Sequence, residues 1–232
     1  SCVAHNVILQ PYFVTDEYYD VEKAEEQIRA VIKGFEPEGI LIEQPLPSYA
    51  AELVELIPPE ADIDCCTTAM IADLYRGGDG FRPATAQAVL AMLDYYGIDL
   101  AGKRMVIVGR GNAVGKPLAF MALGRNATVT ICHSKTENLA EVCRSADVLV
   151  SATGKPGLIT PDFVTENSIV IDVGLSFVDG KTCGDVAKDV YAKCAAVSPV
   201  PGGIGPVTRA VLLHNLTKNY NKPDQSGWDE TI

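Results

Sequence analysis

The sequence predicts an α/β fold in two domains, and three observations support this prediction. Short apolar runs alternate with helix-length segments along the chain, which is the order expected of parallel sheets covered by helices. A cluster of glycines at residues 109–115 directly follows one of these runs. Hydrophobic residues make up 47% of the 232 residues and charged residues 21%, so the chain can bury a substantial core.

The N-terminal part predicts strands and helices in alternation. Residues 7–14 and 39–42 are apolar runs typical of buried strands, and a proline-rich stretch ends the second run. Between them, residues 21–35 carry apolar side chains at helical spacing. A further helix is expected near residues 50–57. The order strand, helix, strand, helix is typical of a parallel sheet.

The second part predicts a larger parallel sheet. A helix over residues 85–96 leads into it, because its apolar side chains share one face and Gly97 supplies a stop. Four apolar runs typical of buried strands follow, at residues 105–108, 128–131, 148–150 and 169–171. Pro117 suits the first turn of a helix after the first run.

The composition argues against several classes of function. The net charge of -11 and the pI near 4.7 disfavour a nucleic-acid surface, which needs clustered Lys and Arg. The seven cysteines contain no C-x-x-C pair and no histidine at ligand spacing, so neither a disulfide framework nor a metal site is predicted, and a reducing cytoplasm is expected. No apolar run is long enough for a transmembrane helix.

The glycine cluster predicts a dinucleotide site. Gly109, Gly111 and Gly115 have the spacing G-x-G-x-x-x-G, one residue longer than the usual fingerprint. Glycines let a strand turn sharply into a helix and let the backbone approach a pyrophosphate, whose charge then lies at the helix N-terminus. The alternative is a glycine turn that only closes an α/β loop. The strand before the turn and the strands after it favour a Rossmann-type nucleotide-binding domain.

The residues near this turn favour NADP over NAD. NAD-binding domains place an acidic residue at the end of the next strand, where it accepts the ribose 2′-hydroxyl. Here Ser134 and Lys135 stand at that strand end, and Arg110 lies within the turn. A hydroxyl and cations bind a 2′-phosphate, whereas a carboxylate would repel it. The alternative for Ser134 and Lys135 is an ordinary solvated loop.

Six stretches of the chain match the motifs of one family. Residues 199–208 read PVPGGIGPVT, against the family signature PVPGGVGPMT. The other matching stretches are residues 39–47, 62–64, 109–117, 152–157 and 171–174. They occur in the same order over essentially the whole chain, which therefore resembles the methylenetetrahydrofolate dehydrogenase/cyclohydrolases.

This resemblance implies an enzyme that oxidises 5,10-methylenetetrahydrofolate to the methenyl form with NADP, followed in many members by hydrolysis to 10-formyltetrahydrofolate. It implies a folate-binding domain of residues 1–97 and 205–232, with a C-terminal helix packed back on it, an NADP-binding domain of residues 98–204, and a homodimer. The implied cofactor contacts are Gly109, Arg110, Gly111, Ser134, Thr153, Gly154 and Leu175. The implied folate contacts are Asp64, Pro201, Gly202 and Gly203, and the catalytic residues expected within the chain are Asp64 and Glu43.

The folate positions each have a second interpretation. The resemblance places Asp64 where an ionised carboxylate accepts the adjacent N–H groups of the pterin. The alternative is an aspartate that caps a helix or a turn. Gly202 and Gly203 either leave room for a flat ligand or form a plain loop after a strand.

The catalytic residues show the largest departures from the family. The family's Tyr-x-x-x-Lys aligns upstream of Ser1, and Tyr19 and Lys23 match its spacing only by coincidence, since they follow the first predicted strand. Cys65 and Cys66 are interpreted as buried thiols and not as nucleophiles, because no base is placed beside them.

Glu43 stands at a catalytic position where the family has glutamine. A carboxylate beside the family's lysine would raise the lysine pKa and keep the amine protonated, and a charged lysine is a poor general base. We therefore expect hydrolysis of the methenyl bridge to be weaker than hydride transfer. The alternative from another class is a non-catalytic NADP- or folate-binding relative that has lost the lysine.

Overall fold

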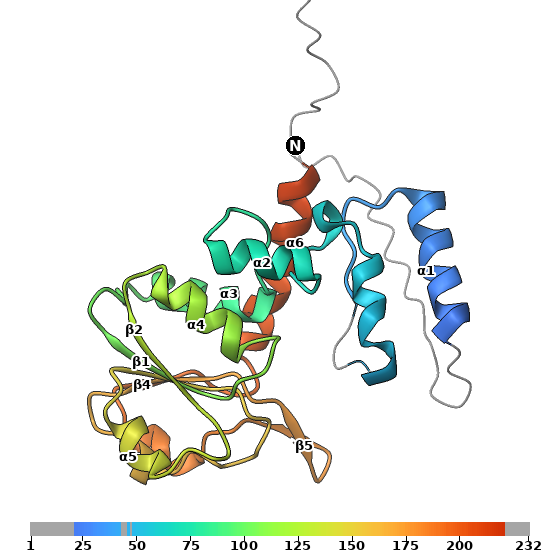
Figure 1. Cartoon of the computed structure of the whole chain (residues 1–232). Coiled ribbons are helices and arrows are strands. Elements are labelled where there is room, and N and C mark those ends of the chain that lie inside the picture. The colour runs from blue at the N-terminus through green and yellow to red at the C-terminus, as the bar shows by residue number, and fades with distance from the viewer. Residues whose placement is uncertain (1–20, 43–45, 47, 221–232) are drawn as a thin grey trace, which may run out of the picture.

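The computed structural model describes residues 21–42, 46 and 48–220 of the chain. Figure 1 shows two parts: a group of helices from the first half of the sequence, and a twisted sheet with helices on both faces. The last helix, α6 (Ile204–Tyr220), runs from the sheet back into the first part. This return of the C-terminal helix is the arrangement that the sequence and its resemblance predict.

The sheet has five parallel strands in the order β2-β1-β3-β4-β7. Its strands are β1 (Arg104–Val108), β2 (Thr128–Cys132), β3 (Val148–Ser151), β4 (Ile169–Asp172) and β7 (Ala196–Val197). The four strands predicted from apolar runs are confirmed, while the two-residue β7 is too short to be recognised from the sequence. The strand order reverses between β1 and β3, which is where doubly wound folds bind their ligands.

The central strands are buried on both faces, whereas the edge strand β2, which the sequence predicts to be buried, is largely exposed because only one neighbouring strand and one helical layer cover it. Met105 and Ile107 of β1 pack into a cluster with residues of α3 (Ala84–Tyr95), α4 (Gly115–Leu123) and α6. The alternate residues of β1, Val106 and Val108, pack on the opposite face with α5 (Leu139–Arg144). Because successive strand residues point to opposite faces, a run without polar residues is required between two helical layers.

A short hairpin of β5 (Ser176–Val178) and β6 (Lys181–Cys183) projects from the sheet-bearing part. This hairpin is not predicted from the sequence. Its tip contains Asp179 at φ 50° and Gly180 at φ 71°, so both tip residues adopt the left-handed conformation that tight hairpins need. Short 3-10 helices follow β3 and β6, at Pro161–Phe163 and Lys188–Ala192.

The N-terminal part is more helical than the sequence predicts. Its helices are α1 (Val21–Phe35), the 3-10 helices Ser48–Leu56 and Pro59–Ala61, α2 (Thr68–Arg76) and α3. The expected strand at residues 39–42 is wrong for the described residues: it forms only one parallel bridge, Ile40 to Asp62. A strand needs a hydrogen-bonding neighbour along its length, and the predicted neighbour at residues 7–14 lies outside the described residues.

Helix α6 joins the two parts through its packing. It packs along α3, and the side-chain amide of Asn215 donates to the carbonyl oxygen of Ile63 at 2.9 Å. A Cβ on Gly39 would lie 2.6 Å from Leu216 Cδ1, so glycine permits this close approach. Within the described part of the chain, no helix is long and apolar enough to cross a membrane.

Candidate active site

The glycine turn after β1 is shaped by two glycines and left open by a third. Gly109 has φ 125°, and a Cβ there would lie 2.4 Å from the carbonyl oxygen of Ala152. A Cβ on Gly115 would lie 2.1 Å from the carbonyl oxygen of Gly109, so this glycine lets α4 start directly over the turn. At Gly111 an added Cβ would meet nothing within 4 Å. The backbone is therefore accessible to a ligand at Gly111.

The N-terminus of α4 lies at this turn. Its N-cap residue, Val114, makes no side-chain capping hydrogen bond, and Pro117 lies in the first helical turn as predicted. The N–H of Lys116 donates to the carbonyl oxygen of Gly111 at 3.1 Å and Pro117 has no N–H, so the positive end of the helix macrodipole is what favours a bound anion here. A diphosphate is the ligand that such a strand–turn–helix unit fits.

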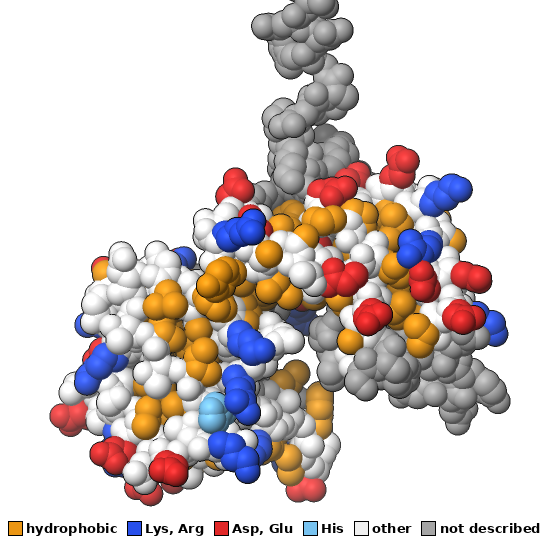
Figure 2. Space-filling view, viewed as in Figure 1, with side chains coloured by type: hydrophobic (Ala, Val, Ile, Leu, Met, Phe, Trp, Pro, Cys, Tyr) orange, Lys and Arg blue, Asp and Glu red, His pale blue; other side chains and the backbone are white. Residues whose placement is uncertain are grey.

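The end of β2 is joined to the glycine turn and presents polar groups to solvent. The N–H of Gly109 donates to the carbonyl oxygen of Cys132 at 2.9 Å. Ser134, Lys135 and Arg110 are exposed, and Figure 2 shows Lys and Arg side chains gathered beside a histidine on the sheet-bearing part. The N–H of Lys135 donates to Nδ1 of His133 at 3.2 Å, which tightens this loop. The arrangement can hold a 2′-phosphate.

The loops after β3 and β4 lie on the other side of the glycine turn. The N–H and the hydroxyl of Thr153 both donate to Oδ2 of Asp185, at 2.7 and 2.8 Å. The hydroxyl of Ser176 donates to the carbonyl oxygen of Gly154 at 3.0 Å, which ties the two loops together. Leu175 is 64% exposed beside this contact. All the cofactor residues predicted from the sequence thus lie at the carboxyl ends of neighbouring strands.

Asp64 is engaged with the N-terminus of α3. Its Oδ1 accepts the N–H of Ala84 at 2.7 Å, so the capping role considered from the sequence is present. Burial raises the pKa of the Asp64 carboxyl, against the lowering effect of the Ala84 N–H. The neighbouring Asp62 is fully buried and accepts the N–H groups of Cys66 and Thr67, at 3.0 and 2.7 Å. Asp62 therefore shapes the loop that presents Asp64.

Cys65 and Cys66 are poor nucleophiles. Burial raises the pKa of each thiol to about 12, with the charges of Asp62 and Asp64 adding to the effect. Since the thiolate is the reactive form, both residues stay protonated near neutral pH. The interpretation as a buried thiol is confirmed for Cys65, whereas Cys66 is only partly buried.

The loop predicted to receive folate joins β7 to α6. Pro201 and Gly202 are exposed, and Gly202 has φ 101°, a conformation that favours glycine. A Cβ on Gly203 would lie 2.3 Å from the carbonyl oxygen of Pro199, so the loop is compact and its exposed tip lacks bulky side chains. Glu43, the other predicted catalytic residue, lies outside the described residues.

Sequence reasoning missed two buried carboxyl groups beneath these loops. Asp172 ends β4 and is 1% exposed, and Asp185 follows β6 and is 0% exposed. Burial raises the pKa of Asp172, and the nearby charge of Asp185 raises it further, while backbone N–H groups oppose both. For Asp172 the sequence does contain a signal, namely an acidic residue at the end of a buried strand. Such a carboxyl group needs several hydrogen-bond donors around it.

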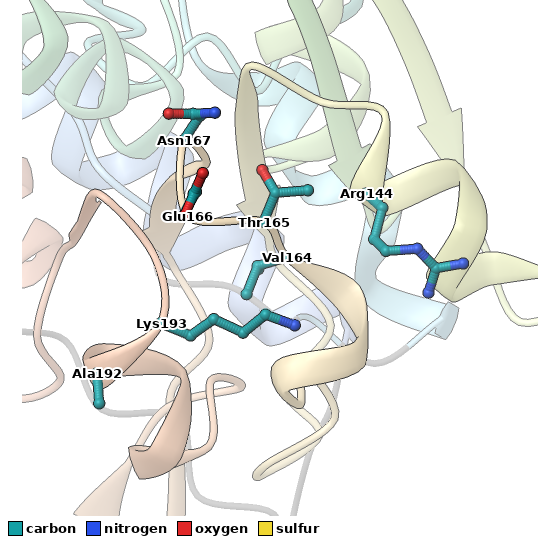
Figure 3. A pocket seen from close by; sticks show the side chains of 7 residues that line it. All are labelled: Arg144, Val164, Thr165, Glu166, Asn167, Ala192 and Lys193. Carbon is teal, nitrogen blue, oxygen red and sulfur yellow. The ribbon is translucent and has the colours of Figure 1, made fainter.

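A separate hollow of about 640 Å³ lies at the end of the sheet opposite to the glycine turn, and Figure 3 shows the side chains that line it. Its lining residues are Arg144, Val164, Thr165, Glu166, Asn167, Ala192 and Lys193. Arg144 and Lys193 donate to the carbonyl oxygens of Asp162 and Pro161, at 2.7 and 2.6 Å. Because this hollow faces the amino ends of the strands, it is distinct from the glycine turn.

Comparison with known proteins agrees with this geometry. The family model for the tetrahydrofolate dehydrogenase/cyclohydrolase NAD(P)-binding domain matches residues 83–224. The bifunctional protein FolD of Clostridium perfringens SM101 is 44% identical over 209 residues, which cover 89% of this chain and 76% of that protein.

Solved structures give the same result. The bifunctional FolD of Campylobacter jejuni superposes with a TM-score of 0.83 at 38% identity, covering 88% of this chain and 74% of that one. The Trypanosoma brucei FolD, solved in complex with NADP and an inhibitor, has a TM-score of 0.81 at 34% identity, covering 87% of this chain and 73% of that one. The chain belongs to the tetrahydrofolate dehydrogenase/cyclohydrolase family.

Proposed function

We propose that the protein oxidises 5,10-methylenetetrahydrofolate to 5,10-methenyltetrahydrofolate with NADP and hydrolyses the product to 10-formyltetrahydrofolate. The observation that carries this proposal is the open backbone of Gly111 between β1 and α4, within a chain 44% identical to a bifunctional FolD protein. Because such close relatives bear the name of a bifunctional enzyme, a non-catalytic binding relative is not favoured.

The cofactor side is assigned to the carboxyl edge of the sheet. Gly109 and Gly111 bring the diphosphate close to the backbone, and the N-terminus of α4 offsets its charge. Arg110 and Ser134 would bind the 2′-phosphate, which NAD lacks. The nicotinamide supplies the hydride acceptor when bound. Thr153, Gly154 and Leu175 would then fix the position of the ring and exclude water from it.

The folate side is assigned to residues 1–97 and 205–232, and the cofactor side to residues 98–204. Asp64 already holds the N–H of Ala84 with Oδ1, so Oδ2 is the oxygen proposed to accept pterin N–H groups. Pro201, Gly202 and Gly203 would face the flat ring system without bulky side chains. The protein contribution to hydride transfer is then mainly orientation.

Hydrolysis of the methenyl bridge is the second proposed activity. The names of the relatives from Clostridium perfringens and Campylobacter jejuni support it, since both are called bifunctional. Glu43 is proposed to weaken it by keeping the family's lysine protonated. The two activities therefore need separate assays.

We also propose a homodimer in the reducing cytoplasm. The cysteines of the described residues are all free thiols, which suits a reducing compartment. Equilibrium sedimentation tests the assembly directly. A monomer at working concentration would contradict the dimer without affecting the proposed chemistry.

The proposed reaction is tested by steady-state assays with 5,10-methylenetetrahydrofolate and either NADP or NAD. We expect reduced nicotinamide to appear with both cofactors and a larger kcat/KM with NADP, because only NADP offers a phosphate to Arg110 and Ser134. Failure to reduce either cofactor would overturn the dehydrogenase proposal, and a preference for NAD would overturn the cofactor assignment.

A further inference from the structure

The buried carboxylate of Asp185 gathers donors from β3 and from the loop that follows it. Its Oδ2 accepts the hydroxyl of Ser151 at 2.8 Å and both the N–H and the hydroxyl of Thr153, at 2.7 and 2.8 Å. Hydrogen bonds to an ionised acceptor are the stronger ones. The conformation of Thr153 is therefore set from below by a side chain that is 0% exposed.

The second oxygen of Asp185 shows that this placement has a cost. Among the described residues, Oδ1 of Asp185 is buried and has no hydrogen-bond partner. Burying an unpaired carboxylate oxygen is unfavourable, and such groups are rare in folded proteins. A Cβ on Gly174 would lie 2.1 Å from this oxygen, so glycine is what lets the carboxylate reach the loop after β4.

Asp172 ties the same region to the neighbouring loops. Its Oδ1 accepts the N–H groups of Gly174 and Asp185, each at 3.0 Å, and its Oδ2 accepts the N–H of Val186 at 2.9 Å. The N–H of Asp172 in turn donates to the hydroxyl of Ser198 at 2.8 Å, just before the loop proposed for folate. The backbone position of Asp185 is therefore fixed as well as its side chain.

The strand order indicates which half of the cofactor would depend on this arrangement. In a doubly wound sheet the pyrophosphate lies over the turn after the first strand, and the adenosine ribose lies at the end of the next strand. These are β1 and β2 here, so the nicotinamide half extends to the opposite side, over β3 and β4. The loop held by Asp185 lies on that side.

We propose that Asp185 is a positioning residue for the nicotinamide half of NADP, acting through Thr153. The inference rests on the proposed function, because it requires that NADP binds at the glycine turn. A positioning role differs from a purely structural one in a measurable way. It predicts a loss confined to ligands that reach over β3, while ligands confined to β1 and β2 are unaffected.

The experiment compares NADP with adenosine 2′,5′-bisphosphate, which contains only the adenosine half. In Asp185→Ala all three donors lose their acceptor, so we expect the Kd for NADP to rise about tenfold or more. The Kd for the bisphosphate should stay within about twofold, because its contacts lie at β1 and β2. Calorimetric titration of both ligands gives the two values.

Two further variants separate positioning from folding. Asp185→Asn keeps an oxygen acceptor but loses the charge, so the Kd for NADP should rise only about threefold. Ser151→Ala removes one donor to the same carboxylate from within β3, and should leave the Kd for NADP within about twofold. If Asp185→Ala does not fold, the selective change in Asp185→Asn carries the test.

The outcomes are distinguishable. Equal losses for NADP and the bisphosphate in Asp185→Ala, or no loss of NADP affinity in any folded Asp185 variant, would overturn the positioning role while leaving the proposed function in place. If the unaltered protein bound neither NADP nor the bisphosphate, the proposed function would fail, and the positioning role would fail with it.

Discussion

The cofactor side and the folate side of this molecule are built in different ways. On the cofactor side, diphosphate binding is proposed for backbone atoms at the carboxyl ends of adjacent parallel strands, shaped by Gly109 and Gly115. On the folate side, it is proposed for side chains from separate segments, such as Asp64 and the loop before α6. The glycine spacing of the diphosphate site can be explained by geometry alone, whereas the folate positions were identified only through the motifs of the family.

The largest effect on NADP binding is expected from alanine substitutions at two positions of the glycine turn, which we compare. Gly115→Ala would place a Cβ 2.1 Å from the carbonyl oxygen of Gly109, so it should destabilise the protein by about 1–3 kcal/mol and remove NADP binding. Gly111→Ala meets nothing in the protein, and the family motif matched at residues 109–117 has serine at this position, so thermal unfolding should be unchanged and the Kd for NADP should stay within about twofold. A large loss of NADP affinity in Gly111→Ala would show that the diphosphate lies closer to this residue than a Cβ allows.

Arg110→Ala tests the assignment of the 2′-phosphate. The variant loses a charge-assisted contact that only NADP can make, so the Kd for NADP should rise about tenfold while that for NAD stays constant. Fluorescence titration of both cofactors measures the change. Equal losses for the two cofactors would instead assign Arg110 to the shared diphosphate.

Two substitutions of Asp64 separate its capping role from its proposed role in substrate binding. Asp64→Asn keeps an oxygen for the N–H of Ala84, so stability should be retained, while the KM for methylenetetrahydrofolate rises about tenfold through loss of the charge. Asp64→Ala should in addition lose about 1 kcal/mol of stability, as other helix caps do. An unchanged folate KM in both variants would leave Asp64 with the capping role alone.

Glu43→Gln is expected to have the smallest effect. Removing the carboxylate lowers the pKa of the family's lysine, so more neutral amine is available as a base and the cyclohydrolase rate rises. Its pH–rate profile should shift to lower pH, since the neutral form then appears at lower pH. Dehydrogenase activity should stay within about twofold, because orientation dominates that step. Equal cyclohydrolase rates in the two proteins would remove the basis of the Glu43 hypothesis.

The sequence predicts the sheet-bearing part well, for a physical reason. Strands such as β1 and β3 are buried on both faces and therefore read as uninterrupted apolar runs. The run at residues 39–42 looks similar, yet it forms only the bridge from Ile40 to Asp62. An apolar run identifies burial, but a strand also requires a neighbour, and pairing is not encoded within the run itself.

The buried carboxylates mark the limit of motif reasoning. Asp185 contacts Thr153 across 32 residues of sequence, and it does so only because the β5–β6 hairpin returns the chain to β3. No local spacing encodes such a contact. The motif at residues 152–157 can be recognised in the sequence. The side chain that holds it in place can be identified only from the folded structure.

Deuterium labelling follows the proposed hydride transfer from methylenetetrahydrofolate to NADP. The intact protein is incubated with NADP and a substrate that carries deuterium on its methylene carbon, and the products are examined by mass spectrometry. Hydride transfer places deuterium on the reduced nicotinamide and yields methenyltetrahydrofolate or its hydrolysis product. Absence of reduced nicotinamide, or appearance of the label only in solvent, would contradict it.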